Sequence, residues 1–461
     1  MLKPIVTLLM LGLLASCSAT IKDVPAPVNL PVQFSASGQA KLQEKWWLAF
    51  NDTALNQLCE QALGNNFSLL AAFNRLDQAK AIAKKSGAEL IPQVDGSFLA
   101  SQASADSLNN NNFSLGLAAS YELDLWGRIR SAVNAAKLDV SGAEEDVFSA
   151  VISLTAELAT TWYRLLEQRQ QLKLLDQQIE INRNNVALVT VRFRGAQATA
   201  ADVFQQQQLL ESVVGNRYTV VSTIAVLENQ LAVLAGKPPG AIALSDLDEF
   251  PAMPPLPETG LSLTLMQRRP DIRKAYLAVQ SADQRIASAI ADRFPKLSLS
   301  ASVEASSPDL QSLLNNWLAT VAGNLVLPII DGRRRVAEVE RSQAISAEAL
   351  NNYATLLLNA VQEVENALVQ ERQQRLFVAN LGKQVQLASQ ASSMIRLRYI
   401  NGAIDFLRVL SAVLSQQSLE RNLLQAQVQL IEYRINLYRA LAGRFPLVDG
   451  STKKLARKPV S

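Results

Sequence analysis

The sequence predicts a mainly helical protein in which one unit of helices and a β-hairpin occurs twice. Two proline-free stretches, 127–194 and 332–399, carry apolar residues in steps of three and four, which is the spacing of a coiled-coil helix. Two shorter stretches, 113–122 and 297–304, alternate apolar with polar residues, as a strand with two different faces does. Motifs of the first half also return in the second half at a nearly constant offset, which indicates a duplicated unit.

The composition excludes several classes of function. The 461 residues are 49% hydrophobic and 18% charged, carry a net charge of +3 and contain no histidine. This charge is too small to favour nucleic acid, and catalysis or metal binding through histidine is excluded. We therefore expect no enzyme, no metal and no cofactor. A carboxylate enzyme remains an alternative, but Glu144-Glu145-Asp146 predict a solvated face of a helix and not paired acids in a pocket.

The N-terminus predicts a lipoprotein. Residues 1–16 contain one basic residue and a short apolar run, which is typical of a secretory signal peptide. Leu14-Ala15-Ser16-Cys17 resembles the lipobox of bacterial lipoproteins, so Cys17 would carry a covalent lipid such as palmitate. Ser18 follows Cys17. An aspartate at this position favours retention in the inner membrane of Gram-negative bacteria, so the serine predicts transfer to the outer membrane. An ordinary signal peptide with a chance cysteine is the alternative. Residues 17–45, rich in Pro, Ser and Ala, would form a tether.

The two repeats are predicted over 46–236 and 261–443, separated by a Pro-rich connection, 237–260, and followed by a tail, 444–461. Cys59 lies in a helical pattern and is expected to be a small buried residue. The elements expected in the first repeat are helices from Trp46 to Leu63 and from Leu69 to Glu89, a β-hairpin over 93–125 with its loop at 105–112, and a long helical hairpin over 127–235. Those expected in the second are a helix over 270–292, a β-hairpin over 296–330 with its loop at 306–315, and a long helical hairpin over 332–442.

The strands have the length of transmembrane β-strands, about 9 to 11 residues. Four such strands cannot close a barrel, and open edges are not tolerated in lipid. Several copies of the chain must therefore share one barrel, with 8 strands for a dimer, 12 for a trimer or 16 for a tetramer. Only the larger two leave an interior much wider than side chains can fill. Their long helices would continue the barrel as an α-helical tube. A small soluble sheet is the alternative.

An ordered set of motifs resembles the TolC-type outer-membrane efflux channels, in particular the lipoprotein branch that acts with resistance-nodulation-division pumps. The motifs are Trp46-Trp47-x-x-Phe50-x-Asp52-x-x-Leu55-x-x-Leu58, Tyr121-Glu122-x-Asp124-Leu125-Trp126-Gly127-Arg128, Arg269-Pro270-Asp271-Ile272, Phe294-Pro295-x-Leu297-Ser298-Leu299, Asp331-Gly332-Arg333, Glu363-Val364-Glu365-Asn366-Ala367-Leu368 and Arg398-Tyr399-x-x-Gly402 with Val409-Leu410. The resemblance implies a homotrimer with a shared 12-stranded barrel in the outer membrane and an α-barrel in the periplasm.

The same resemblance implies a passive, gated exit duct for drugs or other small molecules, docked to a periplasmic adaptor and an inner-membrane pump. Two alternatives remain: the exit duct of a type I protein secretion system, and a lipid-anchored periplasmic coiled-coil scaffold. The scaffold does not account for two membrane-length β-hairpins in matching positions.

The resemblance also implies that the periplasmic tips of the helical hairpins form the closed aperture and the adaptor contact. The tip residues are Arg192, Arg194, Asp202, Arg398, Gly402, Asp405, Val409, Leu410 and Ser411. Gly195 lies one place earlier than the glycine of the family motif, and Ser411 replaces its aspartate. We expect Asp202 and Asp405 either to stabilise helix ends through the macrodipole or to pair with arginines of adjacent hairpins.

Arginines cluster where each β-hairpin becomes a long helix. They are Arg128, Arg130, Arg333, Arg334 and Arg335. Positive charge in the first turn opposes the helix macrodipole, so another interaction should favour it. Contact with anionic lipid head groups is one hypothesis, and local pairing in solvent is the other.

Overall fold

The computed structural model describes residues 28–105, 108–242, 249–260 and 267–445. The chain divides into two compact units. Of the described residues, the first contains 28–29, 73–105, 108–146 and 271–357, and the second contains 30–72, 147–242, 249–260, 267–270 and 358–445. Each unit therefore combines segments from both sequence repeats, so that the repeat is a unit of sequence and not a separate domain.

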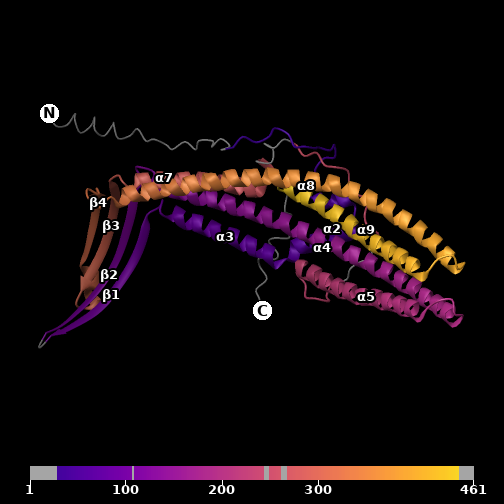
Figure 1. Ribbon diagram of the computed structural model, residues 1–461. Helices are drawn as coiled ribbons and strands as arrows, with labels where there is room; N and C mark the ends of the chain where they lie inside the picture. Colours follow the sequence, from indigo (N-terminus) through magenta and orange to yellow (C-terminus); the bar gives the residue numbers. More distant parts are fainter. Residues whose placement is uncertain (1–27, 106–107, 243–248, 261–266, 446–461) are drawn as a thin grey trace. The chain divides into compact units, whose positions relative to one another are not determined.

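The first unit contains a four-stranded antiparallel sheet in the order β1-β2-β3-β4 (Figure 1). The strands are β1 (Gln93–Ala105), β2 (Leu108–Leu123), β3 (Lys296–Ser307) and β4 (Trp317–Val326). β2 and β3 come from different repeats and pair directly, with Leu115 opposite Ala305 and Tyr121 opposite Leu299. The two predicted hairpins are therefore joined into one sheet, whose outer edges are β1 and β4.

The pairing register gives the sheet one apolar and one mostly polar face, because residues directly opposite each other share a face. The apolar face contains Val94, Phe98, Ala100, Phe113, Leu115, Leu117, Ala119, Tyr121, Leu297, Leu299, Ala301, Val303, Trp317, Val321 and Leu325. The other face contains Asp95, Ser97, Ser101, Ser114, Ser120, Glu122, Ser298, Ser300, Ser302, Glu304, Thr320 and Asn324. Val321 is 84% exposed within the single chain, so this apolar face lacks a cover from the described residues of its own chain.

The predicted loop at 105–112 is wrong. β2 already begins at Leu108, and its first residues pair with the end of β1, for example Asn112 with Ser101. Backbone hydrogen bonds extend the ladder into a polar segment, where alternation of apolar side chains cannot reveal it. In the predicted loop at 306–315, the structure contains a short 3-10 helix, η2 (Leu310–Asn315).

The helices of the first unit are α7 (Pro270–Ala291) and portions of α3 (Phe67–Ala88), α4 (Arg128–Arg194) and α8 (Arg334–Ile400). The prediction of a solvated face at 144–146 is wrong for Glu145, which is fully buried and accepts a hydrogen bond from Arg273 Nε at 2.5 Å. Burial of a carboxylate requires a partner of opposite charge. α7 supplies that partner, and the heptad pattern of α4 alone cannot indicate it.

In the second unit, the predicted helix from Trp46 is divided into η1 (Trp46–Phe50) and α2 (Thr53–Asn65). Asn51 between them has a left-handed φ of 52°, which ends the first turn. Asp52 Oδ1 then accepts hydrogen bonds from the N–H groups of Ala54 and Leu55, both at 3.0 Å, and Oδ2 accepts one from Trp162 Nε1 at 2.7 Å. Asp52 thus caps α2 and fixes it to α4.

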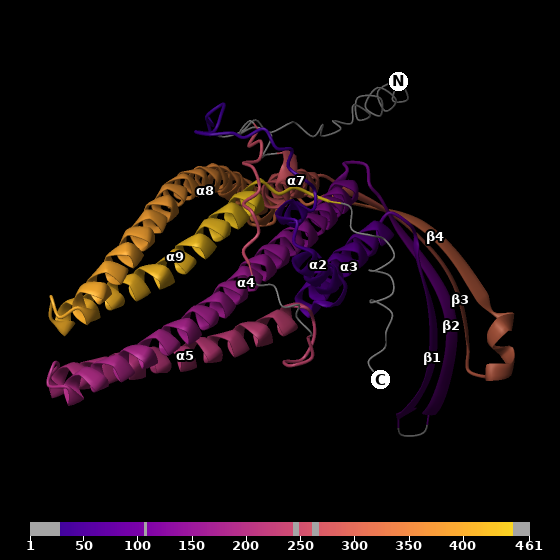
Figure 2. The same cartoon turned by 90° about the vertical axis from the view of Figure 1, so that its right-hand side faces the viewer.

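The long helical hairpins end close to their predicted limits. α4 is followed by α5 (Ala200–Leu234), and α8 is followed by α9 (Phe406–Leu441); Figure 2 shows each pair side by side. The described part of the chain contains no helix with the length and apolar character needed to cross a membrane.

A buried arginine fixes the end of the Pro-rich connection to the hairpins in the second unit. Arg434 of α9 is fully buried and donates to both carboxylate oxygens of Glu371 in α8, at 2.8 and 2.5 Å, and to the carbonyls of Pro254 and Pro255. The guanidinium therefore has its charge neutralised and its hydrogen-bonding groups occupied, which makes its burial tolerable.

Candidate functional site

The tips of the two helical hairpins have matching turns. At the first tip, the N–H of Gln197 donates to the carbonyl of Arg192 at 2.8 Å; at the second, the N–H of Ala403 donates to the carbonyl of Arg398 at 2.9 Å. The residues just before these donors, Ala196 and Gly402, have φ values of 56° and 75°. The left-handed position of the first turn is thus occupied by alanine, and Gly195 lies one place before it.

The two predicted tip carboxylates cap the helices that follow. Asp202 accepts from the N–H of Thr199 at 2.8 Å, while the Thr199 hydroxyl accepts from the N–H of Asp202 at 3.2 Å, which is a capping box. Asp405 accepts from the N–H of Arg408 at 3.2 Å. Among the described residues neither makes an ion pair, so the structure places both in helix-end roles, and pairing between hairpins remains a prediction.

Arg192 connects the two hairpins. Its guanidinium donates from Nη1 to the carbonyls of Tyr399 and Ile400, at 2.6 and 3.1 Å, and lies 4.4 Å from the centre of the Tyr399 ring. The last carbonyls of a helix carry its negative end, which a cation stabilises. Sequence reasoning identified Arg192 as a tip charge but missed its partner on the other hairpin, because the two lie 207 residues apart.

Apolar side chains from all four helices pack around this contact. The cluster contains Leu175, Ile179, Val189, Leu209, Val213, Tyr399, Phe406, Val409 and Val413, with Leu410 partly buried against it. Burial raises the pKa of the Tyr399 hydroxyl, although Arg192 acts in the opposite direction. Val409 and Leu410 are therefore packing residues of the tip.

The other predicted tip residues lie at the surface. Arg194 and Arg398 are exposed, and Ser411 donates to the carbonyl of Leu407 at 2.9 Å. Arg398 and Ser411 line an open groove of about 580 Å³ between α8 and α9. Its other lining residues are mostly small or apolar: Ala388, Ala391, Ile395, Ile404, Leu407, Ala412 and Ser415, with Arg408.

The arginines that follow the first β-hairpin are paired within the chain. Arg128 donates to both carboxylate oxygens of Glu122, at 3.0 and 2.9 Å, and Arg130 approaches Asp124 at 3.3 Å. Asp124 also accepts from the N–H groups of Ile129 and Arg130, at 3.1 and 2.8 Å. Local pairing, the second of the two hypotheses, describes these arginines.

The arginines that follow the second β-hairpin differ from one another. Arg335 pairs with Asp292 at 2.9 Å and with Asp331 at 3.0 Å. Burial alone would raise the pKa of Asp331, but the hydrogen bonds from Arg335 hold it below its ordinary value. Arg333 and Arg334 are exposed, and neither makes an ion pair within the described chain. Lipid contact remains a prediction for these two.

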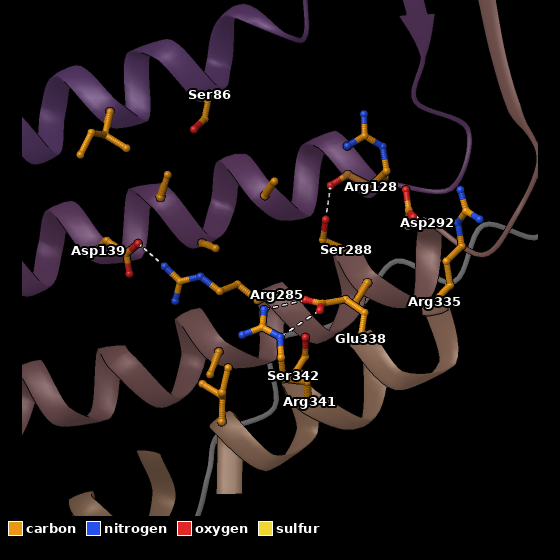
Figure 3. Close-up of a pocket in the computed structure, with 17 residues that line it drawn as sticks. Ser86, Arg128, Asp139, Arg285, Ser288, Asp292, Arg335, Glu338, Arg341 and Ser342 are labelled. Carbon is orange, nitrogen blue, oxygen red and sulfur yellow. Dashed lines mark hydrogen bonds and ion pairs between the residues drawn. The ribbon is translucent and has the colours of Figure 1, made fainter. Parts of the chain in front are cut away.

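A cavity of about 480 Å³ lies nearby among α3, α4, α7 and α8 (Figure 3). Alanines form much of its wall, and its charged side chains are paired. Asp139 binds Arg285 at 2.5 Å and Glu338 binds Arg341 at 2.7 Å, and the pairs of Arg128 and Arg335 are those described above. The paired charges leave no charged side chain of this lining available to hold an ionic ligand.

Of the two cysteines, Cys59 alone lies within the described residues. Cys17 lies outside the described residues, so its lipidation remains a prediction. Cys59 is fully buried, as expected, and burial raises the pKa of its thiol. This buried thiol is a packing residue.

The chain is similar to known proteins over almost its whole length. The family model described as outer membrane efflux protein matches residues 58–237 and 261–443. The pyoverdine export outer membrane protein OpmQ of Pseudomonas aeruginosa is 28% identical, with 97% of each chain covered. The cation efflux system protein CusC of Escherichia coli O157:H7 is 26% identical, with 93% of this chain and 96% of that protein covered.

Solved structures extend the similarity to the fold. The outer-membrane channel OprN has a TM-score of 0.85 and 25% identity, with 92% of this chain and 98% of that chain covered. The open state of the Neisseria gonorrhoeae MtrE outer membrane channel has a TM-score of 0.83 and 25% identity, with 92% and 97% covered. The sheet and the long hairpins are therefore shared with outer-membrane channels.

Proposed function

Because the chain belongs to the outer membrane efflux protein family, we propose that three copies of it form a gated exit duct that docks to a periplasmic adaptor. The chain is the outer-membrane channel component of a tripartite efflux system. The trimer, the gate and the identity of the partners are the finer parts of the proposal.

The observation that carries the proposal is a two-faced sheet of four strands in the order β1-β2-β3-β4, with no strand of the described chain on the outer side of β1 or β4. In lipid, every backbone group needs a partner, so a membrane sheet must close on itself. Three copies supply 12 strands, enough for an interior wider than side chains can fill. The serine-rich face would then line the duct, and the apolar face would meet lipid.

In the proposed gate, the contacts of Arg192 hold the two hairpins together. A duct through the outer membrane would leak if it stayed open, so its periplasmic end should be closed at rest. Arg192 attaches the first hairpin to the carbonyls of Tyr399 and Ile400 on the second. Separation of the hairpins would break this contact and expose the apolar cluster beneath it. Binding of the adaptor would supply the free energy for that change.

The groove between α8 and α9 supports adaptor docking near the tip. Its small side chains, such as Ala388, Ala391 and Ala412, allow close approach of another helix, as small residues do in helix packing generally. Relatives named for pyoverdine export and cation efflux are similar in sequence over 97% and 93% of this chain. We infer that the pump selects the cargo and that the duct passes small molecules of differing chemistry.

The gate is tested by single-channel recording in planar bilayers. Arg192→Met removes the hydrogen bonds and the charge while keeping much of the apolar packing. In one copy, the contacts of Arg192 are together worth about 1 kcal/mol at this partly exposed position. Three copies would raise the open population on the order of 100-fold, and bulky antibiotics should enter cells that carry the variant.

The matched control is Arg194→Met, which removes an exposed charge two residues away and should conduct like wild type. The double variant Asp202→Ala with Asp405→Ala separates the two roles of the carboxylates. Unchanged conductance indicates helix capping alone, and increased conductance indicates pairing across hairpins. If Arg192→Met forms stable oligomers with wild-type conductance, the proposed gate is wrong.

A further inference from the structure

Exposed apolar side chains and arginines occur together between β4 and α8. This junction surface consists of Leu327, Ile329, Ile330, Arg333 and Arg334. Ile329 and Ile330 are 86% and 90% exposed, and both arginines are exposed without an ion pair in the described chain. Large apolar side chains rarely remain so exposed unless something else covers them.

The first repeat provides an internal comparison, because its positions match the second at an offset of 205. Leu327 and Ile329 stand where the first repeat has Glu122 and Asp124, the carboxylates that bind Arg128 and Arg130. Both acids of the first junction are thus replaced by apolar residues in the second.

The two junctions also differ at two further positions. Arg334 stands where the first repeat has Ile129, which is buried. Trp126, which stacks on Phe294 at 4.8 Å and donates to the carbonyl of Pro295 at 2.8 Å, is matched by Asp331, which binds Arg335. The first junction is therefore packed and neutralised within the chain, whereas the second presents apolar groups and two unneutralised cations.

The backbone at Arg333 is strained. Gly127 and Gly332 have left-handed φ values of 77° and 62°, as glycine readily does, but Arg333 also has a φ of 66°. A long side chain adopts this conformation at a cost in free energy. Such strain is retained where the surroundings or a binding role require it.

We propose that the junction surface binds an anionic phospholipid of the periplasmic leaflet, with Ile329 and Ile330 against the acyl chains and Arg333 and Arg334 on the phosphate. The position supports this occupant, because the surface directly follows a strand of the two-faced sheet in an outer-membrane protein. Arginine binds phosphate through charge-assisted hydrogen bonds, and an interfacial segment combines apolar anchors with basic residues. The inference requires the outer-membrane location alone and does not depend on the gate.

The test is native mass spectrometry of the purified full-length protein in detergent, titrated with phosphatidylglycerol or with phosphatidylcholine of the same acyl chains. Wild type should bind phosphatidylglycerol more tightly. Arg333→Gln with Arg334→Gln should weaken phosphatidylglycerol binding roughly 30-fold, since each basic residue near a lipid surface contributes about fivefold. It should weaken phosphatidylcholine binding much less, because the choline cation offsets the charge of that phosphate. The matched control, Arg372→Gln with Lys383→Gln, removes two exposed cations farther along α8 and should bind like wild type.

Two further arms separate lipid from other partners of the arginines. Ile329→Ser with Ile330→Ser should weaken the binding of both phosphatidylglycerol and phosphatidylcholine. Inorganic phosphate should not displace phosphatidylglycerol; displacement at equal concentration would indicate a simple anion site and overturn the proposal. The proposal is also overturned if the arginine variant binds lipid like wild type but its oligomers dissociate at lower temperature, since the arginines would then pair with carboxylates of a neighbouring copy.

Discussion

Ala196 has a left-handed backbone conformation, and the equivalent residue of the second tip, Gly402, is a glycine. The turn after α4 needs a left-handed residue so that Gln197 can donate to the carbonyl of Arg192. Gly402 meets the same need after α8 at no steric cost, whereas the side chain of Ala196 crowds its own backbone. The early glycine of the first tip, Gly195, therefore does not relieve the strain.

Ala196→Gly should stabilise the first tip by about 1 kcal/mol, since the gain from removing the left-handed strain exceeds the extra freedom of glycine in the unfolded chain. The measurement is the midpoint of thermal denaturation in detergent, together with protection of the tip from trypsin. Gly195→Ala serves as the control and should change neither by much. A lower midpoint for Ala196→Gly would contradict the assignment of the turn.

The role of a single charged residue depends on the partner that the fold places beside it. Glu145, expected in solvent, is buried against Arg273, and Arg434 is buried with Glu371 in its reach. Arg128 and Arg333 occupy equivalent positions of the two repeats, yet only Arg128 has a carboxylate partner within the described chain. The environment and not the residue type decides whether an arginine is structural or available for binding.

At the scale of elements, the strands follow the predicted alternation because each must present different chemistry to its two sides. Leu299 lies opposite Gly323 and Tyr121 on the apolar face, while Ser300 lies opposite Ala322 and Ser120 on the other. The two neighbours in sequence therefore test the assignment of the faces.

Leu299→Arg should destabilise the assembled barrel by about 2 to 4 kcal/mol if this position lies at mid-bilayer, because the charge would face lipid. Ser300→Arg should assemble normally and mainly alter conductance and ion selectivity, because its charge would face water. Assembly is measured as the yield of heat-resistant oligomers, and conductance is measured in planar bilayers. Equal loss of assembly in both variants would exclude the assignment of faces.

Helix boundaries were predicted closely because they depend on local signals. Proline and glycine end the helices, and the heptad spacing of α4 and α8 is visible without any partner. The errors occurred where the signal was not local. The ladder of β1 and β2 continues through asparagines, and the break at Asn51 depends on the cap that Asp52 makes with α2 and Trp162.

At the scale of the whole molecule, the duplicated sequence does not produce two independent halves. The sheet pairs β2 of one repeat with β3 of the other, and the tip cluster combines α4 and α5 with α8 and α9. Duplication therefore supplied equivalent elements, and their later divergence allowed different roles at equivalent positions, as the two junctions illustrate.

If Cys17 carries the predicted lipid, the whole molecule has a second attachment to the membrane. Cys17→Ser should abolish labelling with radioactive palmitate and prevent signal removal by the lipoprotein peptidase. Because a barrel can hold the oligomer in the membrane by itself, we expect reduced assembly and not complete loss of efflux. Cys59→Ser, which alters a buried thiol, is the control and should retain full labelling; labelling of Cys17→Ser would refute the assignment.

The sequence by itself determined the repeat, the long helices, the two-faced strands and the family, because periodicity and turn residues express local chemistry. Only the tertiary structure decided which charges are neutralised. Arg192 meets carbonyls 207 and 208 residues away, Glu145 meets an arginine 128 residues away, and Arg333 meets no carboxylate in the described chain. A charge interacts with whatever packing brings within a few ångströms, and sequence spacing does not encode that distance.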